Sequence, residues 1–221
     1  MTKGVIFDVD GTLVDTVYLH CVSWWQALRQ YGHDVETTRI HRAIGMGSDR
    51  ILDHLLGSDE DRDRSADDDI RTAHSTLFGV YWDSLRPTPG ARDLLQAVRD
   101  RDRRVVLASS AAAPELAALR KALDADDIVD TVTGADDAES SKPAPDILQV
   151  ALKRAKLRPE DVVFVGDTVW DVRAASALDV PCFGVTCGGI SEAELLEAGA
   201  AAVYANPKAI LDKLDKVLGE L

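Results

Sequence analysis

The sequence is poor in cysteine and has no long apolar run. Its three cysteines, Cys21, Cys182 and Cys187, are odd in number, and none lies in a Cys-x-x-Cys pair. This pattern predicts neither a disulfide framework nor a zinc site, so we interpret all three as reduced thiols. No stretch of about 18 apolar residues is present, and the N-terminal residues do not form a basic region followed by an apolar segment. We therefore expect a cytoplasmic protein that does not associate with membranes.

Positive charge is also scarce. Lysine and arginine number 25 against 38 aspartates and glutamates, which gives a net charge of -13. Nucleic acids bind clustered lysine and arginine side chains, so this balance argues against nucleic acid as a partner. The hydrophobic content of 46% is sufficient for a buried core. We expect a monomer, because nothing in the sequence indicates a partner chain.

Short apolar runs alternate with helical patterns along most of the chain. The runs lie at residues 5–8, 105–108, 129–133, 162–166, 182–185 and 201–204. Helical patterns outside the first segment lie at residues 91–100, 114–123, 145–155, 170–178, 192–198 and 208–218. Alternation of this kind predicts right-handed crossovers and a parallel sheet. The expected fold class is α/β, with a Rossmann-like parallel sheet covered by helices on both faces.

The first run is separated from the others by a long segment of purely helical pattern, at residues 17–31, 36–44, 49–56 and 67–85. The stretch Arg86-Pro87-Thr88-Pro89-Gly90 then interrupts the periodicity. We predict an α/β core formed by residues 1–16 and 87–221, and a small all-helical cap at residues 17–86. Inserted after the first strand, the cap would cover the edge of the sheet where open α/β sheets bind ligands.

Two acids follow the first predicted strand. Asp8 ends the strand, Asp10 comes two residues later, and Gly11 permits a sharp turn. Both carboxylates can face the crevice at the carboxyl end of the sheet. An isolated Asp-x-Asp-Gly is also an ordinary turn, so its interpretation depends on what the other strand ends carry.

Three later strand ends or loops carry polar residues. Ser109 and Ser110 follow the run at 105–108 and can bind the oxygens of an anion, although serine here can also cap a helix. Lys142 precedes a proline-restricted loop that opens a helix. Asp167 and Asp171 follow the run at 162–166 one helical turn apart, and helix capping is the alternative for Asp167.

The four aspartates would concentrate negative charge at one edge of the sheet. Two unit charges about 4 Å apart repel by about 4 kcal/mol at an effective dielectric constant near 20. Lys142 offers only one compensating charge. A divalent cation bound by oxygen atoms would offset the excess, and carboxylates with a backbone carbonyl and waters suit Mg²⁺. We therefore predict Mg²⁺ as the cofactor.

These motifs occur in a defined order: Asp8-Val9-Asp10-Gly11-Thr12, Ser109, Lys142-Pro143 and Gly166-Asp167-x-x-x-Asp171. The arrangement resembles the haloacid dehalogenase-like hydrolase superfamily over essentially the whole chain. The resemblance implies that Asp8 is a nucleophile that forms an aspartyl-phosphate. It implies that Asp10 is the general acid and then the general base. A carboxylate at this position suits phosphate esters better than halides or phosphonates.

The remaining site residues are assigned by the same resemblance. Mg²⁺ would be bound by the Asp8 carboxylate, the Asp10 backbone carbonyl and Asp167. Asp171 would support the metal. The transferring phosphate would be held by Ser109, Ser110, Lys142 and Gly11.

Two branches of the superfamily are similar to this chain. Residues 15–24, 107–109 and 141–146 resemble β-phosphoglucomutase and its phosphatase neighbours, and residues 187–200 resemble phosphoglycolate phosphatase and its relatives. Asp171 stands where the mutase has glycine, and residues 73–85 lack a lysine that the mutase uses. We predict a phosphatase acting on a small phosphorylated metabolite, similar to phosphoglycolate or a sugar phosphate. A phosphosugar mutase is the first alternative, and a non-catalytic binding module of the same fold is the second.

Two residues of the predicted cap could contact the substrate beyond its phosphate. His20 lies in the first helical pattern, and Arg50, like Arg42, could meet the non-reacting end of the substrate. The alternatives are a polar position on a helix for His20 and solvated helix faces for the arginines.

Overall fold

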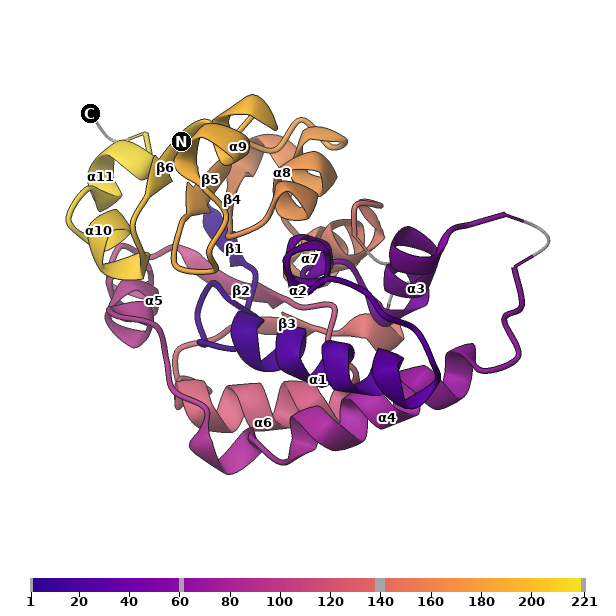
Figure 1. Ribbon diagram of the computed structural model, residues 1–221. Coiled ribbons are helices and arrows are strands. Elements are labelled where there is room, and N and C mark those ends of the chain that lie inside the picture. Colours follow the sequence, from indigo (N-terminus) through magenta and orange to yellow (C-terminus); the bar gives the residue numbers. More distant parts are fainter. Residues whose placement is uncertain (1, 60–61, 138–141, 220–221) are drawn as a thin grey trace.

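The computed structural model describes residues 2–59, 62–137 and 142–219, and within them the chain forms one six-stranded sheet (Figure 1). All neighbouring strands are parallel, in the order β3-β2-β1-β4-β5-β6. The strands are β1 (Gly4–Phe7), β2 (Arg104–Ala108), β3 (Thr131–Thr133), β4 (Val162–Gly166), β5 (Cys182–Val185) and β6 (Ala202–Tyr204). The predicted α/β fold with a parallel sheet is confirmed.

The helices lie close to their predicted positions. They are α1 (Val17–Gln30), α2 (Thr37–Ala43), α3 (Ser48–Leu56), α4 (Asp67–Gly79), α5 (Ala91–Arg99), α6 (Ala113–Leu123), α7 (Asp146–Ala155), α8 (Val169–Ser176), α9 (Glu192–Glu197), α10 (Pro207–Leu211) and α11 (Leu214–Val217). None of the helices described is long and apolar enough to cross a membrane.

Two predicted helices and one strand are shorter in the structure. The pattern at 67–85 forms α4 and then the 3₁₀ turn η1 (Trp82–Ser84), and the pattern at 208–218 divides into α10 and α11. In both places the backbone switches to bonds between residues three apart, Ser84 N–H to Tyr81 O and Lys213 N–H to Ile210 O. Strand β3 begins at Thr131 because the N–H of Val129 bonds within a turn, to Ala125 O.

Helices cover both faces of the sheet, as the alternating pattern predicts. The fully buried strand β1 is central, and its side chains alternate between two hydrophobic clusters. Val5 and Phe7 belong to the cluster formed with α5, α6, α10 and α11. Ile6 belongs to the cluster formed with α7, α8 and α9. The loops at the carboxyl ends of the strands are therefore anchored by a core on each side.

The helical segment between β1 and β2 has a hydrophobic cluster of its own. This cluster runs from Val17 to Ile70, and α1 packs along α4 (Figure 1). The two connections to the sheet lie beside each other. Asp15 N–H donates to Arg86 O at 3.0 Å, and Thr88 N–H donates to Leu13 O at 2.9 Å. On these grounds we propose the division into a core (1–16 and 87–221) and a helical cap (17–86).

Candidate active site

The carboxyl ends of β2, β1 and β4 lie side by side and carry the predicted polar residues. Ser109 follows β2, Asp8 follows β1 and Asp167 follows β4. The loop before α7 brings Lys142 to the same place. The structure therefore assembles side chains that are far apart in the sequence. Ser141, part of the motif that precedes α7, lies outside the described residues.

Lys142 is the central cation of this assembly. Its side chain is 1% exposed, and its ammonium contacts Asp8 Oδ1 and lies 2.7 Å from Asp171 Oδ1. Burial acts to lower the pKa of Lys142, but the Asp171 and Asp8 carboxylates raise it above its ordinary value. The lysine is therefore a permanent positive charge beneath the first loop.

Asp171 is fixed at the start of α8 by a capping box. Its Oδ2 accepts bonds from Thr168 Oγ1 at 2.7 Å and from Thr168 N–H at 3.0 Å, while its own N–H donates to Thr168 Oγ1. The helix cap is therefore Thr168, and the alternative role of Asp167 as the cap is wrong. Asp167 is left free to face the edge of the sheet.

Asp167 is fully buried, and only one of its two carboxylate oxygens has a hydrogen-bond partner among the described residues. Its Oδ1 accepts a hydrogen bond from Thr12 Oγ1 at 2.9 Å. Its Oδ2 has no hydrogen-bond partner among the described residues. Thr12 was not predicted as a site residue, because a threonine after Asp-Gly is unremarkable in a turn.

The described residues offer a fitting place for a divalent cation. One oxygen each from Asp8, Asp167 and Asp171 lies within 4.8 Å of the others. Burial raises the pKa of Asp8 to about 7, although the Lys142 ammonium opposes the shift, and burial raises the pKa of Asp167 well above its ordinary value. A hard cation would stabilise these carboxylates in the ionised form and would provide a partner for Asp167 Oδ2.

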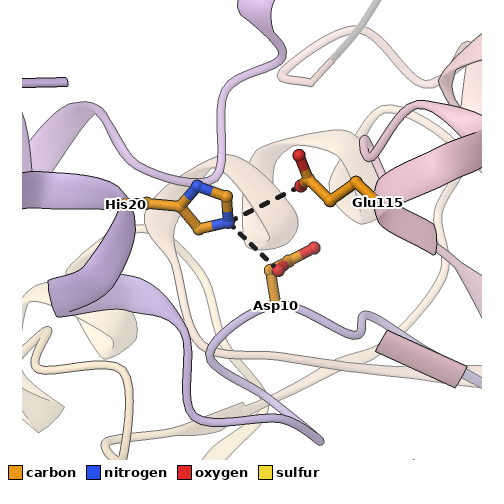
Figure 2. Close-up of side chains that lie close together, drawn as sticks. All are labelled: Asp10, His20 and Glu115. Carbon is orange, nitrogen blue, oxygen red and sulfur yellow. Dashed lines mark hydrogen bonds and ion pairs between the residues drawn. The ribbon is translucent and has the colours of Figure 1, made fainter. Parts of the chain in front are cut away.

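The Asp10 carboxylate lies outside this group and faces the helical segment. Figure 2 shows one ring nitrogen of His20 directed at both Asp10 and Glu115, with His20 Nε2 3.3 Å from Asp10 Oδ1 and 3.6 Å from Glu115 Oε1. Ser109 Oγ donates to Asp10 Oδ2 at 3.3 Å. On its other side, His20 Nδ1 lies 3.1 Å from His74 Nε2 of α4. The structure thus places the predicted residue His20 directly beside Asp10.

Glu115 and His74 were missed in the sequence. Glu115 lies in the first turn of α6, where an acid is common for electrostatic reasons alone. Burial raises the pKa of Glu115 to about 7, against the influence of His20. Burial lowers the pKa of His74 well below its ordinary value. No sequence motif marks either residue, because their proximity depends on how α4 and α6 pack around α1.

An open cavity lies over Asp8 and Asp10. Its other lining residues are His20, Trp24, Ile44, Gly45, Met46, Ser48, Ile51, His74, Ser75, Ser110, Ala111, Ala112 and Glu115. The Ser110 hydroxyl is buried without a hydrogen-bond partner in the described structure and is available to a ligand oxygen.

Three predicted contacts do not fit these positions. Arg50 does not line the cavity and lies 3.8 Å from Asp49, because the helical phase of α3 directs Ser48 and Ile51 inward instead. Arg42 forms an ion pair with Glu194. The amide of Gly11 donates inside its own loop, to Val14 O at 2.8 Å and Thr16 Oγ1 at 3.1 Å, so this N–H is not directed at a phosphate.

The chain is similar to several characterised hydrolases. A protein-family model described as haloacid dehalogenase-like hydrolase matches residues 2–179. A phosphorylated carbohydrates phosphatase from Thermotoga maritima is 30% identical over 98% of this chain and 100% of that protein. A phosphoglycolate phosphatase from Escherichia coli is 29% identical over 84% of this chain and 82% of that protein. A hydrolase from Pseudomonas syringae has a solved structure with a TM-score of 0.92 at 29% identity, covering 98% of this chain and 99% of that one.

The acidic group predicts a pH-dependent stabilisation by Mg²⁺. Because the pKa of Asp8 rises from 3.8 to about 7, the metal-free folded state binds extra protons in this range and loses stability as the pH rises through it. A cation must displace these protons at low pH, so it should stabilise more at high pH. We expect saturating Mg²⁺ to raise Tm by roughly 5 °C at pH 8 and by less at pH 5.5, measured by scanning calorimetry.

The matched variants for this experiment are Asp167→Asn and Asp69→Asn. Asp167 lies in the acidic group, whereas Asp69 is exposed on α4. The first variant should lose the Mg²⁺-dependent shift, and the second should retain it. An undiminished shift in Asp167→Asn would contradict the assignment.

Gly11 and Gly32 provide a second matched pair. Both have left-handed backbones, with φ of +77° and +80°, so the backbone strain of alanine alone should destabilise each by about 1–2 kcal/mol, and the close contacts at Gly11 add to this. Only at Gly11 would the new Cβ meet a site residue, 2.4 Å from Asp167 Oδ2; at Gly32 nothing lies within 4 Å. We expect Gly11→Ala to lose the Mg²⁺-dependent rise in Tm and Gly32→Ala to keep it. Loss in both variants, or in neither, would show that the contact with Asp167 is unimportant.

Proposed function

The chain belongs to the haloacid dehalogenase-like hydrolase family, and we propose that it is a Mg²⁺-dependent phosphatase that hydrolyses small phosphate monoesters through an aspartyl-phosphate on Asp8. Its similarity to named phosphatases supports a phosphoric monoester hydrolase. The observation that carries the proposal is the buried group in which Lys142 joins Asp8 and Asp171, with Asp167 Oδ2 lacking a partner. The substrate class is that of phosphoglycolate or sugar phosphates.

Asp8 is the proposed nucleophile. One of its carboxylate oxygens attacks phosphorus, the bond from phosphorus to the ester oxygen breaks, and the alcohol leaves. Water then attacks the same phosphorus, the Asp8–phosphorus bond breaks, and inorganic phosphate is released. Lys142, fixed between Asp8 and Asp171, offsets negative charge on the phosphoryl oxygens during both displacements.

Asp10 is the proposed acid and base. It donates a proton to the leaving ester oxygen in the first displacement and accepts a proton from the attacking water in the second. Its carboxylate is oriented by Ser109, which donates to Oδ2, and by His20, which lies beside Oδ1. These contacts separate Asp10 from the acidic group around Asp167, so the two aspartates of the first loop have different surroundings.

Asp8, Asp167 and Asp171 are the carboxylates that would hold Mg²⁺. When bound, the cation supplies positive charge that neutralises the phosphate and the carboxylates around it. Ser110, whose hydroxyl is unpartnered among the described residues, is proposed to hold a phosphoryl oxygen. Ser109 is proposed to do the same when its hydroxyl turns from Asp10 to the phosphate. A cytoplasmic location and a monomeric state stay predictions.

Replacement of Asp8 tests the chemical step. Asp8→Asn keeps the shape of the side chain but removes the nucleophilic charge, so we expect Mg²⁺-dependent hydrolysis of p-nitrophenyl phosphate to fall about a thousandfold or more. The exposed Asp69→Asn should hydrolyse the ester at the wild-type rate. Equal rates in Asp8→Asn and the wild type would overturn the mechanism. The absence of wild-type hydrolysis across a broad panel of phosphate esters would overturn the function.

The mutase alternative is not favoured, because the relatives from Thermotoga maritima and Escherichia coli described above are both named phosphatases. In addition, none of the described residues lining the cavity is a lysine. We expect incubation with β-glucose 1-phosphate to release free phosphate if this ester is accepted, as followed by a molybdate assay and chromatography. Accumulation of glucose 6-phosphate without free phosphate would instead establish a mutase.

A further inference from the structure

We propose that the cavity selects phosphate esters of neutral, hydroxyl-rich alcohols, such as sugars and polyols, and discriminates against esters that carry a carboxylate or a second phosphate. This selectivity rests on the phosphatase function proposed above and, of the two substrate types named there, favours sugar phosphates over phosphoglycolate. It follows from the charges and hydrogen-bonding groups that line the cavity beyond the reacting phosphate.

The cavity has an excess of acidic groups. Asp8, Asp10 and Glu115 line it, and no lysine or arginine does so among the described residues. The positions outside the described ranges contain no lysine or arginine in the sequence. Asp8 is offset by Lys142 and by the proposed cation, but a second anionic group on the substrate would still face Asp10 and Glu115.

The lysine and arginine side chains closest to the cavity either form ion pairs with acidic residues or do not line it. Lys142 pairs with Asp8 and Asp171 below the cavity. Arg42 pairs with Glu194 and lies outside this cavity, and Arg50 also does not line it. His20 is flanked by Asp10 and Glu115, which already offset any positive charge on its ring (Figure 2).

The hydrogen-bonding and apolar groups of the cavity suit an alcohol with several hydroxyls. Glu115 offers carboxylate acceptors to a hydroxyl donor, which a substrate carboxylate cannot provide. Ser48, Ser75 and the unpartnered hydroxyl of Ser110 can donate or accept. The cavity is also lined by apolar side chains that can pack against the C–H groups of a carbon chain or ring; these are Trp24, Ile44, Met46 and Ile51.

Two pairs of esters test the selectivity directly. Glycerol 3-phosphate and 3-phosphoglycerate differ in a hydroxymethyl against a carboxylate, as do 2-hydroxyethyl phosphate and phosphoglycolate. Like-charge juxtaposition is strongly unfavourable in a binding site, so we expect kcat/KM at pH 8 with Mg²⁺ to be at least about tenfold higher for the neutral member of each pair. A ratio near one, or a preference for the carboxylates, would overturn the proposal.

Glu115→Gln tests the origin of the selectivity. This change removes a charge but keeps a hydrogen-bond acceptor, so the neutral-to-acidic ratio of kcat/KM should fall at least about threefold. Glu192→Gln is the matched control, since both glutamates lie in the first turn of a helix and Glu192 is exposed. An unchanged ratio in Glu115→Gln, or an equal fall in the control, would overturn the role of Glu115.

A binding measurement separates this proposal from the phosphatase function. Titration calorimetry of Asp8→Asn with the same four esters gives Kd values without turnover. Tighter binding of the neutral members would support the selectivity even if the wild type hydrolysed none of them, in which case only the phosphatase function would fail. Tighter binding of the acidic members would overturn the selectivity while leaving the function intact.

Discussion

The contact of the Lys142 ammonium with Asp8 and Asp171 is the interaction on which the rest of the site depends. A buried ion pair contributes little net stability, but a buried charge without its partner is strongly destabilising. Lys142 is 1% exposed, and its ammonium lies 5.6 Å from the centre of the Phe164 ring in the core. The loop before α7, the end of β1 and the start of α8 must therefore come together for the charges to be satisfied. The site is therefore assembled as these three segments fold together.

The sequence predicts the parts of this site that follow from strand order. Asp8, Ser109 and Asp167 each come directly after an apolar run, and parallel strands direct their carboxyl ends to one edge. The sequence does not predict Glu115 and His74 as site residues. Both lie on helices, and they reach the site only through the way α4 and α6 are placed relative to α1. Arg50 does not line the cavity, because the side of α3 that faces inward is also set by tertiary contacts.

The two aspartates of the first loop occupy electrostatically different surroundings. Asp8 faces Lys142 and the oxygens of Asp167 and Asp171, where the proposed cation would balance the charge. Asp10 faces His20 and Ser109, which are groups that exchange or donate protons. The end of β1 thus directs the Asp8 carboxylate toward the acidic group, and the loop after it directs the Asp10 carboxylate toward His20 and Ser109. The separation of roles that the family resemblance implies has a physical basis in the fold.

The paired connections of the helical segment also bear on how such proteins diverge. The chain enters the helical segment after Val14 and leaves it at Pro87. The backbones of these two connections are hydrogen-bonded to each other. Changes in length or sequence between these points leave the register of the six strands undisturbed. Ile44, Met46 and His74, which line the cavity, all lie between them. Mutation there can alter which alcohol is accepted while the residues that handle phosphate remain under separate selection.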